Sequence, residues 1–296
     1  MTSLKFLEKT VRGTILFDEP MSRHTSFHIG GKAEALYLPS DEEDLISLIK
    51  ILEKENIPYY ILGNGTNVLV SDKGLKGVVI KLGNRFVGID PDRKGALAGT
   101  SLPKLLKTLC KLGLGGLEKL AGIPGSVGGA IKMNAGIPFF TISDVLKAVR
   151  VYRKGEVFWL NKEDISFSYR HSSINDALIL EALFNLSPSP SFEIAKNIEE
   201  ILKQRKVTQP VRARSAGCVF KNPQGTTAGE LLDKVGAKGM RQGDAYVSHK
   251  HANFIINRGN ATAKDVYLLI QRCRELVREK LHLELQLEIE LWGEFP

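Results

Sequence analysis

The chain has 296 residues, of which 43% are hydrophobic and 25% charged, and its formal net charge is +8. This composition is ordinary for a globular protein, and the length predicts two or three domains. The N-terminal residues lack an apolar core, and no uncharged apolar run is long enough to cross a membrane, so we expect neither a signal peptide nor membrane insertion. The positive charge permits nucleic-acid binding, but aromatic residues make up only 7% and no run of five basic residues occurs. We therefore expect no nucleic-acid partner.

The first third of the chain alternates expected strands with one helix. Strands are predicted at 35–38 and 59–62 from their apolar, β-branched and aromatic residues. Between them, Ser40 and Glu43 form a capping box for an amphipathic helix that ends near Asn56.

A glycine-rich loop, Gly63-Asn64-Gly65-Thr66-Asn67, follows the second strand and precedes a third at 68–70. A Rossmann fingerprint needs a third glycine that opens a helix, and Val68 occupies that position, so the Rossmann interpretation fails. A loop of this kind between strands either binds a phosphate through backbone N–H groups or is a plain hairpin turn.

Glycine is densest in the next part of the chain. A strand at 77–82 and a helix from Ser101 to Gly113 come first. Residues 113–136 then contain eight glycines, interleaved with apolar residues such as Ile123 that a flexible linker does not require. Because glycine weakens helices and strands, we expect this backbone to approach a large flat or phosphorylated ligand.

The middle of the chain leads to a thiol in a cation-rich segment. A hairpin is expected at 149–152 and 156–160, a strand at 178–186 and a helix from Ser191. Residues 201–229 contain no acid but six basic residues, and Cys218 lies in a glycine-containing turn within this segment. This pattern predicts a site for an anionic substrate.

The remaining cysteines and histidines indicate no metal or disulfide. Three cysteines make no disulfide framework and favour a reducing cytoplasm, with Cys110 and Cys273 expected to be buried among leucines. His249 and His251 share one face of an expected strand at 246–257, but no cysteine or acid lies at ligand spacing, so we predict no metal site.

The C-terminal part contains two expected helices and a last strand. Residues 228–235 form a short helix, Thr262 caps a long one, and a strand at 283–292 alternates acidic with apolar residues. Acids that alternate along an edge strand are usually solvated, although one could be catalytic.

Seven motifs, in this order, resemble the UDP-N-acetylenolpyruvoylglucosamine reductase family over residues 25–293, nearly the whole chain. They are Thr25-Ser26-Phe27-His28-Ile29-Gly30-Gly31, Leu62-Gly63-Asn64-Gly65-Thr66-Asn67, Gly122-Ile123-Pro124-Gly125-Ser126-Val127-Gly128-Gly129, Asn134-Ala135-Gly136, Ser168-Tyr169-Arg170, Gly217-Cys218-Val219-Phe220-Lys221-Asn222-Pro223 and Leu287-Glu288-Ile289.

The resemblance implies an α+β fold with a two-part FAD-binding region of the vanillyl-alcohol-oxidase (PCMH) type and a C-terminal α+β substrate-binding domain. The implied boundaries are 1–82 and 83–208 for the two FAD-binding subdomains, with 283–296 returning to the second, and 209–282 for the substrate domain. The short interval between Arg170 and Lys206 is similar to the subclass that lacks an extra substrate-clamping loop.

The implied activity is that of a UDP-N-acetylmuramate dehydrogenase: NADPH reduces FAD, and FAD N5 passes hydride to enolpyruvyl-UDP-N-acetylglucosamine during peptidoglycan precursor synthesis. The resemblance further implies a cytoplasmic monomer. The alternative is a related FAD-dependent sugar or lactone oxidase or dehydrogenase, which has no need of the Cys218 motif. A nucleic-acid-binding protein without enzymatic activity is a more distant alternative.

The resemblance also carries residue roles over to this chain. Cys218 stands at the proton-donor position, which is serine in much of the family, while Arg170 and Glu288 match the residues that stabilise the intermediate. Nearby cations favour a thiolate, which cannot donate, so what keeps the thiol protonated is open. Tyr169, Lys206 and Asn222 match substrate contacts. The implied FAD contacts are Gly63, Asn64, Gly65, Thr66, Asn67, Gly122, Pro124, Gly125, Ser126, Gly128, Gly129, Asn134 and Gly136.

Overall fold

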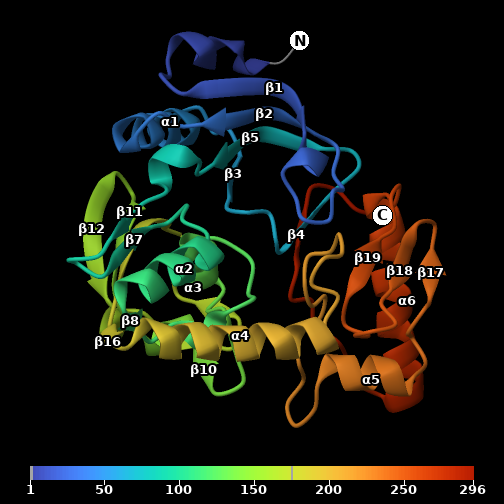
Figure 1. Ribbon diagram of the computed structural model, residues 1–296. Helices are drawn as coiled ribbons and strands as arrows, with labels where there is room; N and C mark the ends of the chain where they lie inside the picture. The colour runs from blue at the N-terminus through green and yellow to red at the C-terminus, as the bar shows by residue number, and fades with distance from the viewer. Residues whose placement is uncertain (1–2, 175) are drawn as a thin grey trace. The chain divides into compact units, whose positions relative to one another are not determined.

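The computed structural model describes residues 3–174 and 176–296, and most of its elements are labelled in Figure 1. The chain divides into two compact units. Unit 1 comprises Met1–Leu16, Leu36–Asn64 and Val78–Arg205, and unit 2 comprises Phe17–Ala35, Gly65–Gly77 and Lys206–Pro296.

Four strands from the first part of the chain form one sheet in the order β1-β2-β5-β3, in which β3 and β5 run parallel. The strands expected at 35–38, 59–62 and 77–82 are confirmed, whereas β1 has no counterpart in the sequence-based expectations. The bounds are β1 Thr14–Pro20, β2 Lys32–Leu38, β3 Tyr59–Leu62 and β5 Leu75–Lys81.

Helix α1 (Glu42–Lys54) is capped by a different residue from the one expected. Asp41 is the N-cap and accepts a hydrogen bond from the Asp44 backbone N at 2.9 Å, so the predicted Ser40 cap is wrong. The Ser40 backbone N instead donates to Asp44 Oδ2 at 2.8 Å, because the carboxylate turns back over the start of the helix. The apolar face is as predicted, and its buried members are Leu45, Leu48, Ile49 and Leu52.

Unit 1 contains an antiparallel five-stranded sheet in the order β12-β11-β15-β7-β6. The expected hairpin and the strand that follows it are confirmed as β11, β12 and β15. The bounds are β6 Ile89–Asp90, β7 Gly95–Leu97, β11 Leu146–Arg153, β12 Glu156–Asn161 and β15 Leu178–Phe184.

Helices α2 and α3 belong to the same core as this sheet. Helix α2 (Leu102–Leu112) has the expected caps: Ser101 accepts from the Lys104 N, and Gly113 is left-handed at φ 65°. Helix α3 (Val127–Lys132) lies inside the glycine-rich stretch, where no helix is expected from the sequence. The later helix α4 (Ser191–Thr208) begins where predicted.

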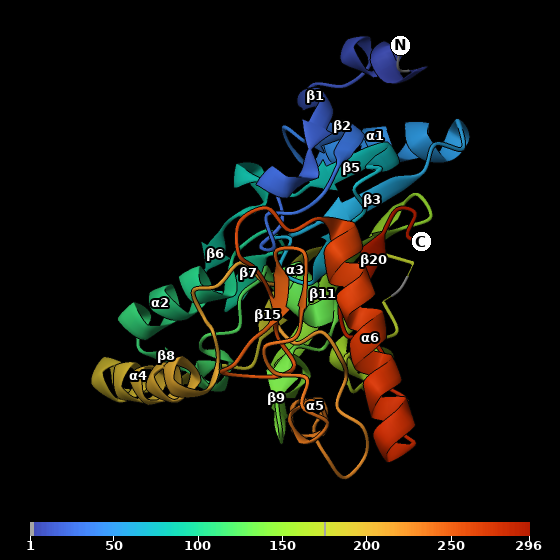
Figure 2. The same cartoon turned by 90° about the vertical axis from the view of Figure 1, so that its right-hand side faces the viewer.

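The core of unit 2 forms around α6 (Ala263–Leu281), seen along its length in Figure 2. The core also includes α5 (Ala228–Lys234) and the antiparallel sheet β17-β18-β19. Thr262 caps α6 as predicted. The strands are β17 Arg241–Gln242, β18 Ala245–Val247 and β19 Ile255–Asn257.

The single strand expected at 246–257 is therefore wrong, because the segment turns back on itself between β18 and β19. His249 and His251 lie in this connection and do not share a strand face. Across residues 3–174 and 176–296, no group of three or more His, Cys, Asp or Glu side chains could hold a metal ion.

The last strand is shorter than expected and has a distant partner. Only Glu290–Trp292 is regular strand (β20), and it runs parallel to β4 (Val68–Val70). From the resemblance, residues 283–296 are expected to belong to the 83–208 subdomain. In the structure, β20 instead forms its backbone hydrogen bonds with β4, and both strands belong to unit 2. None of the described helices has both the length and the hydrophobicity needed to cross a membrane.

Candidate active site

In the thiol turn of unit 2, which contains Gly217 and Cys218, the residues that follow Cys218 are more closely packed than the glycine before it. Gly217 adopts φ 77°, and a Cβ added to it would meet no atom within 4 Å, so the turn is loosely packed before Cys218. Val219 and Phe220 that follow are buried, and the Val219 N donates to the Asn253 carbonyl at 2.9 Å. Cys218, between the loosely packed Gly217 and the buried Val219, is half-buried.

The structure brings the Glu288 segment alongside the thiol turn. The Glu288 backbone N donates to the Val219 carbonyl at 2.8 Å, and Phe220 forms an antiparallel bridge with Leu287. Cys218 and Glu288 thus lie on paired segments, although about seventy residues separate them in the sequence. Backbone pairing of this kind holds the two side chains predicted to be catalytic on one rigid element.

The second half of the first glycine loop supports the Glu288 segment. Asn67 Nδ2 donates to the Glu288 carbonyl at 3.1 Å, and the Glu290 N donates to the Asn67 carbonyl at 2.8 Å. Gly65 adopts φ 64°, and a Cβ added there would collide with the His24 carbonyl oxygen, so only glycine fits.

Ser26 connects this loop to the thiol turn. Its Oγ lies 2.7 Å from the Ser215 carbonyl and 3.2 Å from the Gly65 carbonyl, to which its backbone N also donates. The sequence indicates Ser26 only as part of a motif and assigns it no role. A hydroxyl between two distant segments has no periodicity or spacing by which it could be recognised.

Two predicted substrate contacts also belong to unit 2. Asn222 Oδ1 accepts from the backbone N of Ala228, the first residue of α5, at 3.1 Å, which fixes the amide at the end of the thiol segment. Lys206 is exposed near the end of α4, and its carbonyl accepts from Lys250 Nζ at 2.6 Å. Lys250 therefore adds a cation to the acid-free segment that the local sequence does not reveal.

Arg170 and Tyr169, in unit 1, form the two-residue turn between β13 (Phe167–Ser168) and β14 (His171–Ser172). Arg170 adopts φ 55°, which is uncommon for a residue with a side chain. Its guanidinium lies 5.0 Å from the centroid of the Tyr169 ring, and its Nη2 donates to the Gly136 carbonyl at 3.2 Å.

Further hydrogen bonds fasten this hairpin to the end of α3. Ser172 Oγ donates to the Lys132 carbonyl at 2.9 Å, and Asn134 Nδ2 donates to the Ser168 carbonyl at 3.1 Å. Asn134 is only 5% exposed, and its Oδ1 has no hydrogen-bond partner among the described residues. A buried acceptor left open in this way is suited to a hydrogen-bond donor on a bound ligand.

The second glycine loop, residues 122–129, is closely packed, and several of its backbone N–H groups donate to acceptors within the protein. The first three N–H groups of α3 donate to the Thr100 carbonyl, the Ala98 carbonyl and Ser126 Oγ, at 2.8, 2.9 and 3.3 Å. They are engaged within the protein, so the phosphate contact predicted for this loop depends on its other groups. A Cβ on Gly63 would lie 2.5 Å from Ser126 Oγ, so the two glycine loops meet at this serine.

The remaining cysteines only partly follow the expectation. Cys273 is buried, and burial raises the pKa of its thiol to about 12. Cys110 is half-buried rather than buried, and it lies in the last turn of α2. Its Sγ is 3.5 Å from the Ser191 carbonyl oxygen.

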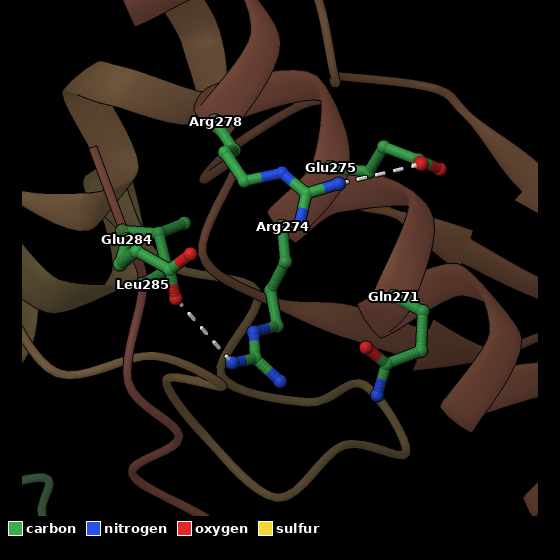
Figure 3. A pocket seen from close by; sticks show the side chains of 6 residues that line it. All are labelled: Gln271, Arg274, Glu275, Arg278, Glu284 and Leu285. Carbon is green, nitrogen blue, oxygen red and sulfur yellow. Dashed lines mark ion pairs between the residues drawn. The ribbon is translucent and has the colours of Figure 1, made fainter. Parts of the chain in front are cut away.

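A polar pocket beside α6 is separate from the predicted site residues (Figure 3). Arg274 pairs with Glu284 at 4.0 Å, and Arg278 pairs with Glu275 at 3.7 Å. The charges that line the pocket neutralise one another, and we assign it no role. Its lining residues are Gln271, Arg274, Glu275, Arg278, Glu284 and Leu285.

Comparison with known proteins gives full-length matches. Residues 209–292 match the family "UDP-N-acetylenolpyruvoylglucosamine reductase, C-terminal domain", and residues 33–161 match the family "FAD binding domain". The chain is 45% identical over 291 residues to UDP-N-acetylenolpyruvoylglucosamine reductase of Moorella thermoacetica, covering 97% of this chain and 96% of that protein. The reductase of Syntrophus aciditrophicus is 42% identical over 296 residues, covering 97% and 95%.

A solved structure agrees with these matches. The crystal structure of UDP-N-acetylenolpyruvylglucosamine reductase from Thermus caldophilus superposes with a TM-score of 0.83 at 40% identity, covering 95% of this chain and 99% of that one. The predicted resemblance and the predicted fold class, α+β with an FAD-binding region, are confirmed.

Proposed function

Because the chain belongs to the UDP-N-acetylenolpyruvoylglucosamine reductase family, we propose that it reduces enolpyruvyl-UDP-N-acetylglucosamine to UDP-N-acetylmuramate, with Cys218 as the proton donor. NADPH is the reductant and FAD the cofactor. The structural observation that carries the residue roles is the hydrogen bond from the Glu288 N to the Val219 carbonyl, which pairs the segments of Cys218 and Glu288.

The residues present fit an FAD cofactor. The buried Asn134 Oδ1, open among the described residues, can accept a hydrogen bond from an isoalloxazine N–H, and Gly136 lies two residues further along. The two glycine loops, 63–67 and 122–129, are the segments that would hold the rest of the cofactor. When bound, FAD accepts hydride from NADPH and delivers it to the enolpyruvyl double bond.

Cys218 would supply the proton that completes the reduction. Hydride adds to one carbon of the double bond, and the S–H proton adds to the other, which leaves a thiolate that is reprotonated from solvent. A thiol with a pKa of about 8.5 is a far stronger acid than an alkyl hydroxyl, so cysteine suits this step. Cys218 is half-buried, so its sulfur would be within reach both of a bound substrate and of the water that restores its proton.

Arg170 and Glu288 would stabilise the charge that develops before the proton arrives. The guanidinium of Arg170 can bind the enolpyruvyl carboxylate through two parallel N–H bonds. Glu288 can help only as a hydrogen-bond donor, which requires that its carboxyl be protonated during the reaction.

The cationic segment of unit 2 would hold the substrate diphosphate. Lys206 and Asn222 are the contacts we assign to it, with Tyr169 as a further substrate contact from its turn. Residues 201–229 have no acid to repel the phosphates. We further propose a cytoplasmic monomer; the small, odd number of cysteines, three in 296 residues, suits a reducing compartment.

An anaerobic experiment with the purified protein tests this function. NADPH should bleach the flavin absorbance, and enolpyruvyl-UDP-N-acetylglucosamine should restore it without oxygen. A sugar or lactone oxidase would recover its absorbance with oxygen but not with this substrate. A colourless protein that failed to bind added FAD would contradict the proposal.

A further inference from the structure

The side chain of Asn253 is bonded to both backbone groups of one residue in the thiol segment. Its Oδ1 accepts from the Phe220 N at 2.9 Å, and its Nδ2 donates to the Phe220 carbonyl at 2.8 Å. Its own carbonyl accepts from the Val219 N at 2.9 Å. Asn253 thus bonds the backbone of two consecutive residues, Val219 and Phe220, which directly follow Cys218.

Water cannot replace these bonds, because both partners are buried. Asn253 and Phe220 are each 1% exposed. Burying an amide is costly unless its donor and its acceptor are both satisfied, and Phe220 satisfies both. The amide is therefore held in one orientation, and it holds Phe220 in turn.

The opposite side of the same segment carries the glutamate. The Val219 carbonyl accepts from the Glu288 N at 2.8 Å, while the Val219 N is bound to Asn253. Before Cys218, by contrast, Gly217 has open space where a Cβ would be. The thiol segment is thus held on both sides: Ser26 bonds the Ser215 carbonyl before it, and Asn253 and the Glu288 segment hold Val219 and Phe220 directly after Cys218.

We propose that the Asn253 side chain is a positioning residue for proton transfer, which fixes the Cys218 segment against the Glu288 segment. This role rests on the proposed function. Asn253 lies in the turn between β18 and β19, far from both partners in sequence, and acts through the backbone of Phe220 and not through contact with the substrate.

A misplaced donor slows proton transfer steeply, since displacement by about 1 Å can cost a hundredfold in rate. Asn253→Ala removes both bonds to Phe220 and should slow the reoxidation of reduced FAD by the substrate at least about tenfold. Reduction of FAD by NADPH does not use the thiol and should stay within about twofold of wild type. Stopped-flow flavin absorbance measures the two steps separately.

A double mutant separates positioning from general damage. In a Cys218→Ala background there is no donor to position, so Asn253→Ala should change the residual reoxidation rate by less than about twofold. An undiminished effect in that background, or equal slowing of both half-reactions, would overturn the proposal.

Asn257→Ala is the matched control. Asn257 is also a buried asparagine of unit 2, but its side chain bonds Phe27, Gly259 and Ala261. Its loss should lower the melting temperature and leave the ratio of the two half-reaction rates unchanged. The same change in that ratio as in Asn253→Ala would count against a specific role.

Asn253→Asp provides a variant that keeps the native shape. A protonated carboxyl at position 253 can make both bonds to Phe220, whereas an ionised one cannot donate. The rate of FAD reoxidation in the variant, divided by the wild-type rate at the same pH, should therefore rise as the pH falls. A pH-independent ratio would contradict the inference. Failure of the wild-type protein to be reoxidised at all would instead contradict the proposed function.

Discussion

Arg170 Nη2 donates to the Gly136 carbonyl at 3.2 Å from a backbone position that an arginine seldom occupies. The φ of Arg170 is 55°, where a side chain costs about 1 kcal/mol or more relative to glycine. The hairpin is fastened to α3 by Ser172 and Asn134, which can offset this cost. Phe139 and Lys154 also adopt a positive φ, so the role proposed for the Arg170 side chain needs a test of its own.

Arg170→Gly should therefore separate stability from activity. Relief of the left-handed backbone contributes about 1 kcal/mol, which largely offsets the loss of the hydrogen bond to Gly136 and of the contact with the Tyr169 ring, each worth about 1 kcal/mol or less. The free energy of unfolding should stay within about 1 kcal/mol of wild type, while reoxidation of FAD by substrate falls by about a hundredfold or more. Urea unfolding and stopped-flow absorbance give the two values. Retained turnover would remove Arg170 from the proposed site.

Substitutions of Cys218 should affect only the second half-reaction. Cys218→Ser leaves an O–H donor in place and should keep activity within about tenfold of wild type, with a changed pH profile. Cys218→Ala leaves no donor and should reduce reoxidation by the substrate to a small residual rate, while NADPH still bleaches the flavin. Normal turnover by the alanine variant would exclude Cys218 as the proton donor.

Two variants of Glu288 can reveal the protonation state in which it acts. Its backbone bonds to Val219 and Asn67 do not use the carboxyl, so both variants should fold. If the carboxyl acts as a donor, Glu288→Gln should retain more activity than Glu288→Ala, since the loss of one such donor costs about a hundred- to a thousandfold. Equal rates for the two variants in reoxidation assays would indicate that Glu288 acts in its ionised form.

The Asp44 network should make the protein sensitive to acid. Burial acts to raise the pKa of this carboxyl, but hydrogen bonds from Tyr37, Ser40 and Arg12 outweigh burial and lower the pKa below its ordinary value of 3.8. A lowered pKa in the folded state stabilises the fold above pH 3.8, and this contribution is lost as the pH falls through the folded-state value.

Asp44→Asn should remove that dependence. The variant should be less stable than wild type at neutral pH by about 1–3 kcal/mol, because a neutral amide is a weaker acceptor for the four donor groups of Tyr37, Ser40 and Arg12. The difference should shrink as the pH falls below 4. Melting temperatures of both proteins between pH 3 and pH 7 test this, and a gap that stays constant with pH would contradict the role of Asp44.

Alkylation should distinguish the three cysteines. Burial raises the pKa of Cys273 to about 12, and only the thiolate reacts, so iodoacetamide should leave this residue unmodified in the native protein. The half-buried Cys110 and Cys218 should be labelled first. Peptide mass spectrometry before and after denaturation reads out each site, and early labelling of Cys273 would contradict its burial.

The sequence predicts elements well where local signals act alone. The caps of α2 and α6 follow from Ser101, Gly113 and Thr262, because capping depends on a few neighbouring residues. It fails where tertiary bonds decide. Helix α3 forms in a glycine-rich segment because its first N–H groups are bonded to Ala98, Thr100 and Ser126. The sequence of the helix itself does not predict these partners.

The candidate site divides in the same way. Cys218, Arg170 and Glu288 are found because each belongs to a motif that the resemblance identifies. Asn253 and Ser26 are assigned no role from the sequence, because they act through backbone atoms of residues more than thirty positions away. A side chain that bonds backbone atoms can have any residue type as its partner, so no pattern of residue types in the sequence reveals such a contact.

The parallel pairing of β4 with β20 has a consequence for the order of folding. Val68 pairs with Glu290, so more than two hundred residues separate the partners, and such distant contacts form late. During synthesis β4 has no partner until the last strand has been made, and an exposed strand edge favours aggregation. Unit 1 lacks this dependence and can fold while the ribosome is still at work. The Glu288 segment therefore joins Cys218 only after residues 283–292 have been made, and a nascent chain without them would hold a finished hairpin around Arg170 but not the paired Cys218 and Glu288 segments.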